Sequence, residues 1–361
     1  MDPTQAFFRV DASFEIGYGH LYRCLTLANA FGSLGIVCTF ICRDLDGIPK
    51  DVIKSNGHNL ELISTYKTHS GHNDHLSSLE ESVWAYDAAI TKNIIQKPID
   101  LLIVDHYEID YLWEKEVKDL SKSFIVIDDL ANRKHDCDIL IDQNLGSNLE
   151  DYRNLVPRGT KLFIGPEFAL LRPEFKKYRN FSLKRRKDLE IKNILVSLGG
   201  VDRNNFIEKI LTTLKNINLR MLSKVDVVLG KGNDQKESLK EIGKSFPITL
   251  NFYQDVKNMA NLMSQADLII GAGGISSWER CSLGIPSIIF ILADNQKKGA
   301  YALEKENCSI VINENQSFED NLIFALDHFS IKSNLKKSIN SCKNISDGEG
   351  VNKILKAIFS K

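Results

Sequence analysis

Short apolar runs alternate with stretches of helical spacing along the first half of the chain. The runs are near-continuous, as in parallel strands that are covered on both faces. They predict strands at Phe7–Ala12, Val37–Cys42, Leu60–Ile63, Leu101–Asp105, Phe124–Asp128, Ile139–Asp142 and Leu162–Gly165. Helical spacing between them predicts helices, for example at His20–Leu34, Leu79–Ile95 and Tyr111–Ser121. The alternation is typical of a doubly wound α/β domain, which we place at residues 1–173.

The pattern is interrupted at residues 174–190 and then restarts. This stretch is polar and basic with few aromatic residues, which favours a solvated linker over a nucleic-acid patch. Further strands are predicted at Ile194–Leu198, Val225–Gly230, Thr249–Phe252, Leu268–Gly271, Ser287–Ile291 and Ser309–Ile312. Helices are predicted at Asn205–Leu214, Val256–Ser264, Ser276–Leu283, Phe318–Phe329 and Val351–Phe359. The sequence therefore predicts a second Rossmann-like domain at 191–361, a cleft between the two domains, and a final helix that could pack back on the first.

Composition narrows the class of protein. The 361 residues carry a net charge of −1, so no overall field attracts nucleic acid or an anionic membrane. We expect no membrane span, because no apolar run approaches the roughly 18–20 residues that one needs. The polar N-terminus is not typical of a signal peptide. Seven scattered cysteines without a C-x-x-C motif favour reduced thiols and a cytoplasmic location. Nothing in the sequence indicates an oligomeric state.

The first candidate site is the loop Gly17-Tyr18-Gly19-His20, between a predicted strand and a predicted helix. Such junctions commonly bind phosphates or nucleotides. The third glycine of G-x-G-x-x-G is absent, since position 22 is tyrosine, so we expect no dinucleotide cofactor. The positive end of the helix disfavours a further positive charge, and a neutral imidazole at His20 is the form that a general base requires. The alternative is that His20 only caps the helix.

A second strand–loop–helix junction contains Gly273, Gly274, Ile275, Ser276 and Ser277. Its backbone N–H groups and two hydroxyls are suited to bind a pyrophosphate. Glu279, one turn further on, could accept hydrogen bonds from ribose hydroxyls. Ser276 and Glu279 also match the S-x-x-E capping box, so the alternative is that this pair only begins the helix.

Weaker candidates follow other predicted strands. Asn295 and Gln296 carry amides that suit sugar hydroxyls or acetamido groups, and Gly199 and Gly200 form another loop at the predicted cleft. Tyr107, within Asp105-His106-Tyr107, could place a phenol near the same space, with the His106 imidazole beside it. Taken alone, each of these is better explained as part of the scaffold.

Two patterns resemble metal sites. His69, His72 and His75 lie in a polar stretch without helical or strand periodicity, which favours a solvated loop because a metal site needs rigid ligands. Two Asp-x-Asp sequences, at 44–46 and 136–138, match by chance too easily to indicate a divalent ion. We therefore predict no metal.

Taken together, several stretches of this chain resemble the UDP-2,4-diacetamido-2,4,6-trideoxy-β-L-altropyranose hydrolases of pseudaminic acid synthesis. The resemblance extends in order from Phe7 to about Gln296. It rests on Phe8–Ala12, Gly17–Ala28, Asp128–Arg133, Asp142–Gly146, Tyr152–Pro157, Ala169–Phe175, Gly271–Glu279 and Asn295-Gln296. It implies a GT-B fold, similar to that of the UDP-GlcNAc transferase of peptidoglycan assembly, with UDP bound mainly by the C-terminal domain.

The resemblance also implies a reaction and residue roles. The anomeric C–O bond of the UDP-sugar is hydrolysed with inversion and without a metal, which gives UDP and 2,4-diacetamido-2,4,6-trideoxy-L-altrose. His20 corresponds to the catalytic base, Glu279 to the ribose-binding glutamate, Asn295 and Gln296 to an amide pair, and Tyr107 to a sugar contact. Two alternatives stay open: a GT-B glycosyltransferase acting on a UDP-sugar, and a non-catalytic UDP-sugar sensor, which has no use for a base at His20.

Overall fold

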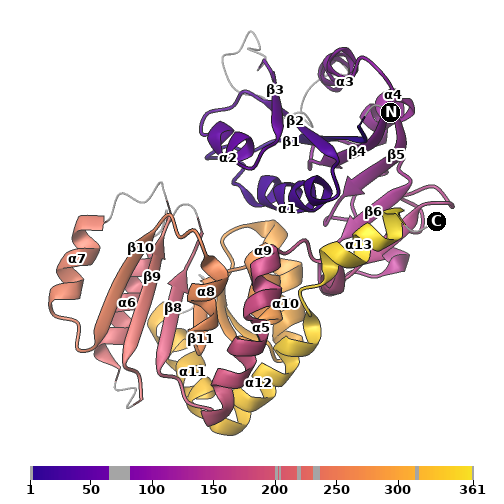
Figure 1. Ribbon diagram of the computed structural model, residues 1–361. Coiled ribbons are helices and arrows are strands. Elements are labelled where there is room, and N and C mark those ends of the chain that lie inside the picture. Colours follow the sequence, from indigo (N-terminus) through magenta and orange to yellow (C-terminus); the bar gives the residue numbers. More distant parts are fainter. Residues whose placement is uncertain are drawn as a thin grey trace. The chain divides into compact units, whose positions relative to one another are not determined.

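The computed structural model describes residues 3–64, 82–199, 202, 205–217, 221–230, 236–313 and 317–359. The chain divides into two compact units, which are drawn in Figure 1. Unit 1 comprises residues 1–170 and 350–361, and unit 2 comprises residues 171–349.

Unit 1 is built on a seven-stranded parallel sheet in the order β3-β2-β1-β4-β5-β6-β7. The strands are β1 (Gln5–Val10), β2 (Val37–Arg43), β3 (Asn59–Ile63), β4 (Ile99–Asp105), β5 (Ser121–Ile127), β6 (Ile139–Asp142) and β7 (Lys161–Ile164). The helices are α1 (Gly19–Ser33), α2 (Lys50–Ser55), α3 (Ser82–Ile94), α4 (Tyr111–Val117) and α13 (Gly350–Phe359), with 3-10 turns at Lys118–Leu120, Leu149–Tyr152 and Pro166–Phe168. The strand order reverses at β1 and β4, which makes their carboxyl ends the expected ligand-binding edge.

Alternating side chains of this sheet enter two cores. Phe8 and Phe40 face α1 and stack with ring centroids 4.9 Å apart, and Phe31 of α1 closes the cluster. Residues of the opposite parity, such as Ile41, pack with Trp113 of α4. This two-sided burial explains why the strands are near-continuous apolar runs.

Helix α13 belongs to unit 1 although it follows unit 2 in the chain. Ile354 is fully buried there, and the ring of Phe359 meets Phe31 edge-on at 5.8 Å between centroids. A Cβ at Gly350 would stand 2.3 Å from the carbonyl oxygen of Ala169, so only glycine allows this close approach.

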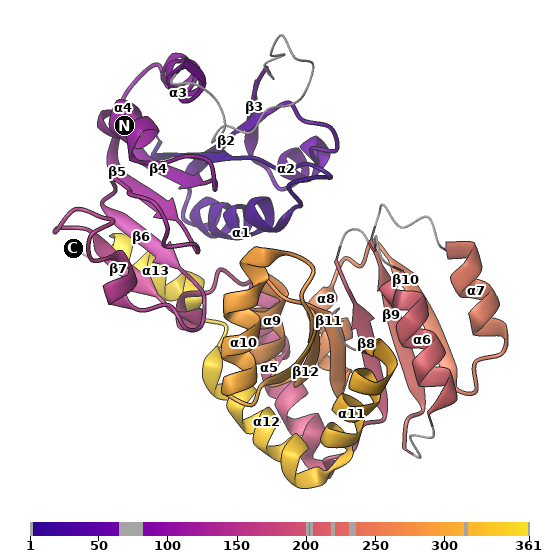
Figure 2. The same ribbon diagram turned by 180° about the vertical axis from the view of Figure 1, so that it is seen from behind.

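Unit 2 repeats the plan with a six-stranded parallel sheet in the order β10-β9-β8-β11-β12-β13, and Figure 2 shows its helices on both faces. The strands are β8 (Asn193–Ser197), β9 (Lys224–Leu229), β10 (Thr249–Gln254), β11 (Leu268–Ala272), β12 (Ser287–Phe290) and β13 (Ser309–Ile312). The helices are α5 (Pro173–Arg185), α6 (Phe206–Asn216), α7 (Lys236–Lys244), α8 (Met259–Ser264), α9 (Ile275–Ser282), α10 (Lys297–Lys305), α11 (Phe318–Ser330) and α12 (Lys332–Ile345), with 3-10 turns at Arg186–Asp188 and Asp294–Gln296. The order reverses here at β8 and β11, so this sheet too has a switch point.

The basic stretch 174–190 is not the solvated linker that its composition indicates. Most of it is helix α5 of unit 2, and three of its arginines donate to carbonyl oxygens at the carboxyl ends of other helices. Arg179 donates to the carbonyl of Lys343 in the last turn of α12 at 2.6 Å and to that of Ser346 just after the helix at 2.8 Å. Arg185 and Arg186 do the same after α8, at 2.6 and 2.5 Å. Cations are favoured at these negative helix ends, so the charges serve the fold.

Candidate active site

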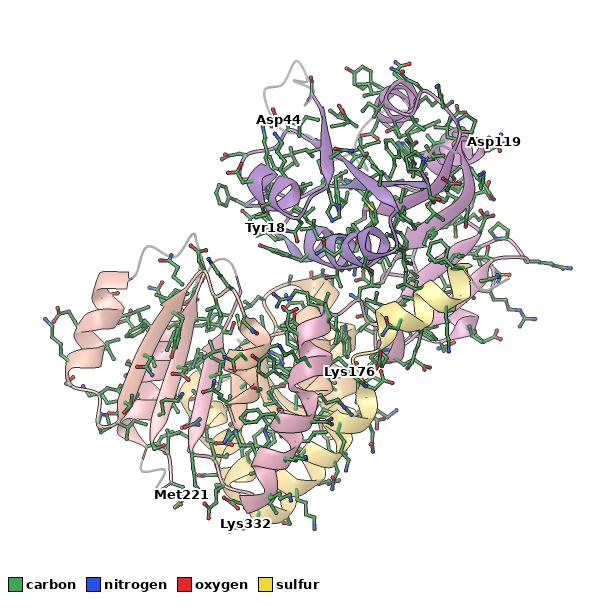
Figure 3. The ribbon with its side chains drawn as sticks, in the orientation of Figure 1. Tyr18, Asp44, Asp119, Lys176, Met221 and Lys332 are labelled. Atoms are coloured by element: carbon green, nitrogen blue, oxygen red, sulfur yellow. The ribbon has the colours of Figure 1, made fainter. Side chains whose placement is uncertain are left out.

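His20 stands at the switch point of unit 1, where the chain passes from β1 into α1. Gly17 donates its N–H to the carbonyl of Ser13 at 2.9 Å and has φ +84°, a conformation that favours glycine. Tyr18, labelled in Figure 3, is the N-cap of α1, and its hydroxyl donates to the carbonyl of Gly47 at 3.1 Å. His20 is the second residue of the helix, and α1 has no side-chain cap. The capping alternative for His20 is therefore wrong.

The imidazole of His20 is bound instead to a buried carboxylate. Its Nδ1 lies 2.5 Å from Oδ1 of Asp105, the last residue of β4. Arg23, one turn along α1, donates Nε and Nη2 to the two oxygens of Asp105, each at 2.6 Å. The Nη1 of Arg23 also donates to Asp129 at 2.8 Å. The strand end thus holds a carboxylate between an imidazole and a bidentate guanidinium.

Electrostatics fix the charge of this group. Burial alone would raise the pKa of Asp105, but attraction to Arg23 and His20 outweighs burial and lowers that pKa well below its usual value. Asp105 is therefore an anion, which can only accept hydrogen bonds. We infer that Nδ1 of His20 carries the hydrogen and that Nε2 is the ring atom left to take a proton. The His20 side chain is 12% exposed and Asp105 is fully buried.

Of the two rings that follow β4, only one lies beside His20. The ring of Tyr107 meets the imidazole edge-on, with centroids 4.4 Å apart. His106 turns inward, and its Nε2 lies 2.9 Å from Asp11. Burial lowers the pKa of His106 although Asp11 acts in the opposite direction. The Tyr107 phenol therefore lies beside His20, whereas the His106 imidazole is part of the interior.

The glycine loop of unit 2 also stands at a switch point. β11 ends at Ala272, Gly274 has φ +90° and is the N-cap of α9, and the helix begins at Ile275. A capping box with Glu279 at its third helical position requires Ser276 as the N-cap, but Ser276 lies inside the helix, so the capping-box alternative is wrong. The first N–H groups of α9 consequently carry no side-chain cap, as an anion-binding helix start requires.

Glu279 and Ser277 are both engaged within unit 2. Oε1 of Glu279 lies 3.4 Å from Nη2 of Arg172, and the Glu279 side chain is 14% exposed. Burial raises the pKa of Glu279, and Arg172 opposes that rise. The hydroxyl of Ser277 accepts from Arg280 at 2.7 Å and is buried. A sugar hydroxyl at Glu279 would therefore compete with Arg172, and of the two serine hydroxyls Ser277 is held by the fold.

Gly271 and Arg280 also shape this junction, and the sequence gives no sign that they contact each other. A Cβ at Gly271 would stand 2.6 Å from the carbonyl oxygen of Ser197 on β8 and 2.9 Å from Nη1 of Arg280. Arg280 also donates to the carbonyl of Ala272 at 2.9 Å. Because Gly271 has no side chain, Arg280 can pack against β11 and hydrogen-bond the carbonyl of Ala272, where the glycine loop begins.

The amide pair lies beside the glycine loop. A Cβ at Gly273 would meet the Cβ of Gln296 at 2.9 Å, so the two predicted motifs are in contact. Oε1 of Gln296 accepts from the N–H of Leu292 at 3.1 Å, and Asn295 is exposed in the same turn. Gly199 follows β8 with φ +96°, while its predicted partner Gly200 lies outside the described residues.

Each Asp-x-Asp sequence that resembled a metal site has an aspartate in an ion pair with a lysine. In the two Asp-x-Asp sequences, Asp44 pairs with Lys50 and Asp136 with Lys118, both at 2.6 Å. The histidines at 69, 72 and 75 lie outside the described residues. A different cluster emerges from the fold: the Sγ atoms of Cys281, Cys308 and Cys342 lie within 4.8 Å of one another. Their wide spacing in the sequence gives no sign of this cluster.

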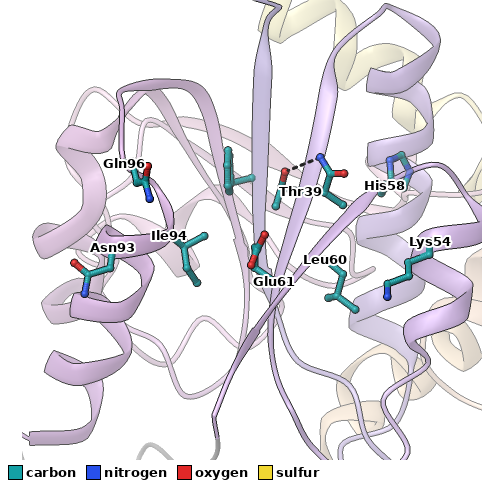
Figure 4. A pocket seen from close by; sticks show the side chains of 10 residues that line it. Thr39, Lys54, His58, Leu60, Glu61, Asn93, Ile94 and Gln96 are labelled. Carbon is teal, nitrogen blue, oxygen red and sulfur yellow. Dashed lines mark hydrogen bonds between the residues drawn. The ribbon is translucent and has the colours of Figure 1, made fainter.

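A cavity of about 670 Å³ lies elsewhere in unit 1, and Figure 4 shows its lining. It is bordered by β2, β3 and the ends of α2 and α3, where Asn59 donates to Thr39 at 3.4 Å. The lining residues are Phe7, Thr39, Lys54, His58, Asn59, Leu60, Glu61, Asn93, Ile94 and Gln96. No candidate site residue lines this cavity, so we do not assign it to the active site.

Among the described residues, no helix has both the length and the apolar character that crossing a membrane demands.

Comparison with known proteins identifies the fold. Residues 193–355 match the Glycosyltransferase family 28 C-terminal domain. The crystal structure of MurG from Acinetobacter baumannii superimposes with a TM-score of 0.71 at 13% identity, over 99% of this chain and all of that one. With its two parallel doubly wound sheets, the chain has the GT-B fold, which confirms the predicted fold class.

Three relatives are similar in sequence. An uncharacterized protein of Methanocaldococcus jannaschii is 32% identical over 300 residues, which are 80% of this chain and 56% of that protein. The UDP-2,4-diacetamido-2,4,6-trideoxy-β-L-altropyranose hydrolase of Campylobacter jejuni is 26% identical over 75% of this chain and 86% of its own length. The spore coat polysaccharide biosynthesis protein SpsG of Bacillus subtilis is 23% identical over 94% of both chains. The matching region thus spans little more than half of the archaeal relative.

Proposed function

We propose that this protein is a UDP-sugar hydrolase that cleaves the anomeric C–O bond of UDP-2,4-diacetamido-2,4,6-trideoxy-β-L-altropyranose. The products are UDP and 2,4-diacetamido-2,4,6-trideoxy-L-altrose, for pseudaminic acid synthesis. The observation that carries the proposal is the His20–Asp105 pair at 2.5 Å, held at the switch point of a GT-B unit. The similarity to the Campylobacter hydrolase supports this choice of substrate.

In the proposed reaction, a water molecule attacks C1 of the sugar from the face opposite UDP. Nε2 of His20 takes one proton from this water, the new C1–O bond forms, and the bond from C1 to the β-phosphate oxygen breaks. Asp105 orients the ring and stabilises the imidazolium that results. The transition state has oxocarbenium character, and inversion follows from attack on the opposite face. Tyr107, in edge contact with His20, is assigned to the sugar.

We assign the UDP group to unit 2. The uncapped N–H groups at the start of α9 bind the diphosphate and stabilise the charge that grows on the leaving group. Gly17, Gly19, Gly199 and Gly200 are assigned to close backbone approach to the substrate. Glu279 is assigned to the ribose hydroxyls, and Asn295 and Gln296 to polar groups of the sugar. No metal or organic cofactor has a step in this scheme.

The second candidate is a glycosyltransferase of the GT-B fold. It is favoured by the match of residues 193–355 to a glycosyltransferase domain. A base at His20 would serve a sugar hydroxyl as well as water. A UDP-sugar sensor is less well supported, because binding alone does not need an imidazole aligned by a buried carboxylate.

We also propose that the protein is located in the cytoplasm, because all seven cysteines are free thiols.

The test is incubation of the purified protein with the UDP-sugar, with a chelator present and no acceptor. The hydrolase assignment predicts equal amounts of UDP and free reducing sugar. UDP release that depends on an added sugar or lipid acceptor would select the transferase instead. Tight UDP-sugar binding without any turnover would select the sensor.

A further inference from the structure

Three thiols meet in the interior of unit 2, apart from the glycine loop. Cys281 lies on α9, Cys308 immediately precedes β13, and Cys342 lies on α12. Their Sγ atoms are all within 4.8 Å of one another, and the three residues are between 1% and 3% exposed. We call this group the trithiol cluster. Two helices and the turn before β13 contribute one sulfur each, so the fold fixes the arrangement.

The geometry is close to that of a three-coordinate thiolate site. With metal–sulfur bonds of about 2.3 Å, sulfurs at the corners of a trigonal plane stand about 4.0 Å apart. The trithiol cluster would have to contract by less than about 1 Å to close around such an ion. Thiolate ligands select soft d10 ions such as Cu(I), Zn(II) and Cd(II) over hard cations.

The charges around the cluster favour an anionic thiolate complex. Arg280 precedes Cys281 in the chain, is 1% exposed and has an Nε atom without a hydrogen-bond partner. It interacts electrostatically with Cys281 and Cys342, and Glu279 is the carboxylate that acts on it. Arg179 donates to carbonyl oxygens. Buried cations ordinarily have an anion nearby. Three thiolates around one soft d10 metal ion carry a net negative charge, which Arg280 and Arg179 would balance.

We propose that Cys281, Cys308 and Cys342 form a binding site for one soft d10 metal ion, held by three thiolates. The site is separate from the proposed hydrolysis and supplies no step in it. Its role is structural, because it joins α9, which begins at the glycine loop, to α12 and to the start of β13. Binding to a folded but not an unfolded site stabilises the fold by mass action.

The test uses Cd²⁺, whose thiolate complexes absorb in the ultraviolet, added to the reduced full-length protein without oxygen. We expect one equivalent per chain, with a thiolate charge-transfer band. Cys308→Ala should weaken Cd²⁺ binding by about 100-fold or more, since even loss of an outer-shell partner costs about 10–100-fold. Cys38→Ala, which removes a buried thiol of unit 1, is the matched control and should bind like the unmodified protein.

A second measurement needs no variant and covers the case in which Cys308→Ala does not fold. The protein is alkylated with free Cd²⁺ at about 100 times the dissociation constant, and peptide mapping measures the alkylation rate of each cysteine. Bound metal should then slow alkylation of Cys281, Cys308 and Cys342 by about 100-fold and leave Cys38 and Cys137 unchanged. The proposal is overturned if the protein binds no Cd²⁺, or if protection falls on other cysteines or on all seven alike.

Discussion

Replacing Asp105 by asparagine tests the arrangement on which the proposed chemistry depends. The asparagine side chain would keep the size of the aspartate but lose the negative charge that faces His20 at 2.5 Å and Arg23 twice at 2.6 Å. Arg23 is only 4% exposed and would keep Asp129 as its one remaining carboxylate partner among the described residues. The substitution therefore leaves a buried cation poorly balanced and gives the imidazole a partner that can donate as well as accept.

The expected cost is large for a single atom change. Breaking a buried ion pair from one side costs about 3–5 kcal/mol, and the remaining Asp129 places this case near 3 kcal/mol. For a unit of this size, that corresponds to a fall in Tm of roughly 6–12 °C. Activity should fall by about 10²–10⁴-fold, since the base loses its orientation and tautomer. Thermal unfolding by circular dichroism and the initial rate of UDP release give the two numbers.

The contribution of Asp105 to the stability of the fold depends on pH in a definite direction. Because the pKa of Asp105 is lowered in the folded state, its contribution to stability is complete above the unfolded-state pKa of about 3.9 and is lost as pH falls through the folded pKa. The Tm difference between the unmodified protein and Asp105→Asn should therefore be largest near neutrality and shrink below about pH 4. An unchanged Tm at pH 7 together with full activity would show that Asp105 neither stabilises the fold nor orients His20.

Three further substitutions separate chemistry from binding and fold. His20→Ala should lower turnover by about 10²–10⁴-fold and leave UDP affinity intact. The control is His58→Ala, which alters a histidine bound to Asn29. Comparable rates in the two variants would remove His20 from the mechanism. Glu279→Ala should weaken UDP binding in calorimetry, whereas Glu174→Ala, which also removes a partner of Arg172, should not; equal affinities would mean that Glu279 serves only the fold. Gly271→Ala should lower Tm, because its Cβ would meet the Ser197 carbonyl at 2.6 Å, and an unchanged Tm would show that the strands yield.

The strands are predictable from the sequence because they are buried on both faces. Apolar runs such as Ile139–Asp142 have the predicted bounds, and most other strands differ by only a few residues at either end. Helices α7, α10 and α12 are not predicted, because their polar sequences with scattered apolar residues resemble loops. Composition predicts a linker in place of helix α5, since it cannot show that the arginines of this helix bind the carboxyl ends of other helices.

The candidate sites are predictable as loops but not as hydrogen-bonded groups. The glycine spacing locates His20 and Gly274, whereas the role of Asp105 depends on β4 lying beside β1, which brings Asp105 to His20 although they are 85 positions apart in sequence. The spacing of Ser276 and Glu279 allows a capping box as the alternative, but the N-cap of α9 is Gly274, two residues before Ser276. The trithiol cluster depends on three elements meeting, which no local spacing indicates.

The most direct test of the proposed function is the fate of the sugar when the protein meets UDP-2,4-diacetamido-2,4,6-trideoxy-β-L-altropyranose in ¹⁸O-labelled water with a chelator and no acceptor. Inverting hydrolysis at C1 predicts that UDP and the free sugar appear in equal amounts, that the label is on C1 of the sugar and not on the phosphate, and that the first-formed anomer is inverted. Label on the phosphate, a retained anomer, or UDP release only after an acceptor is added would contradict it.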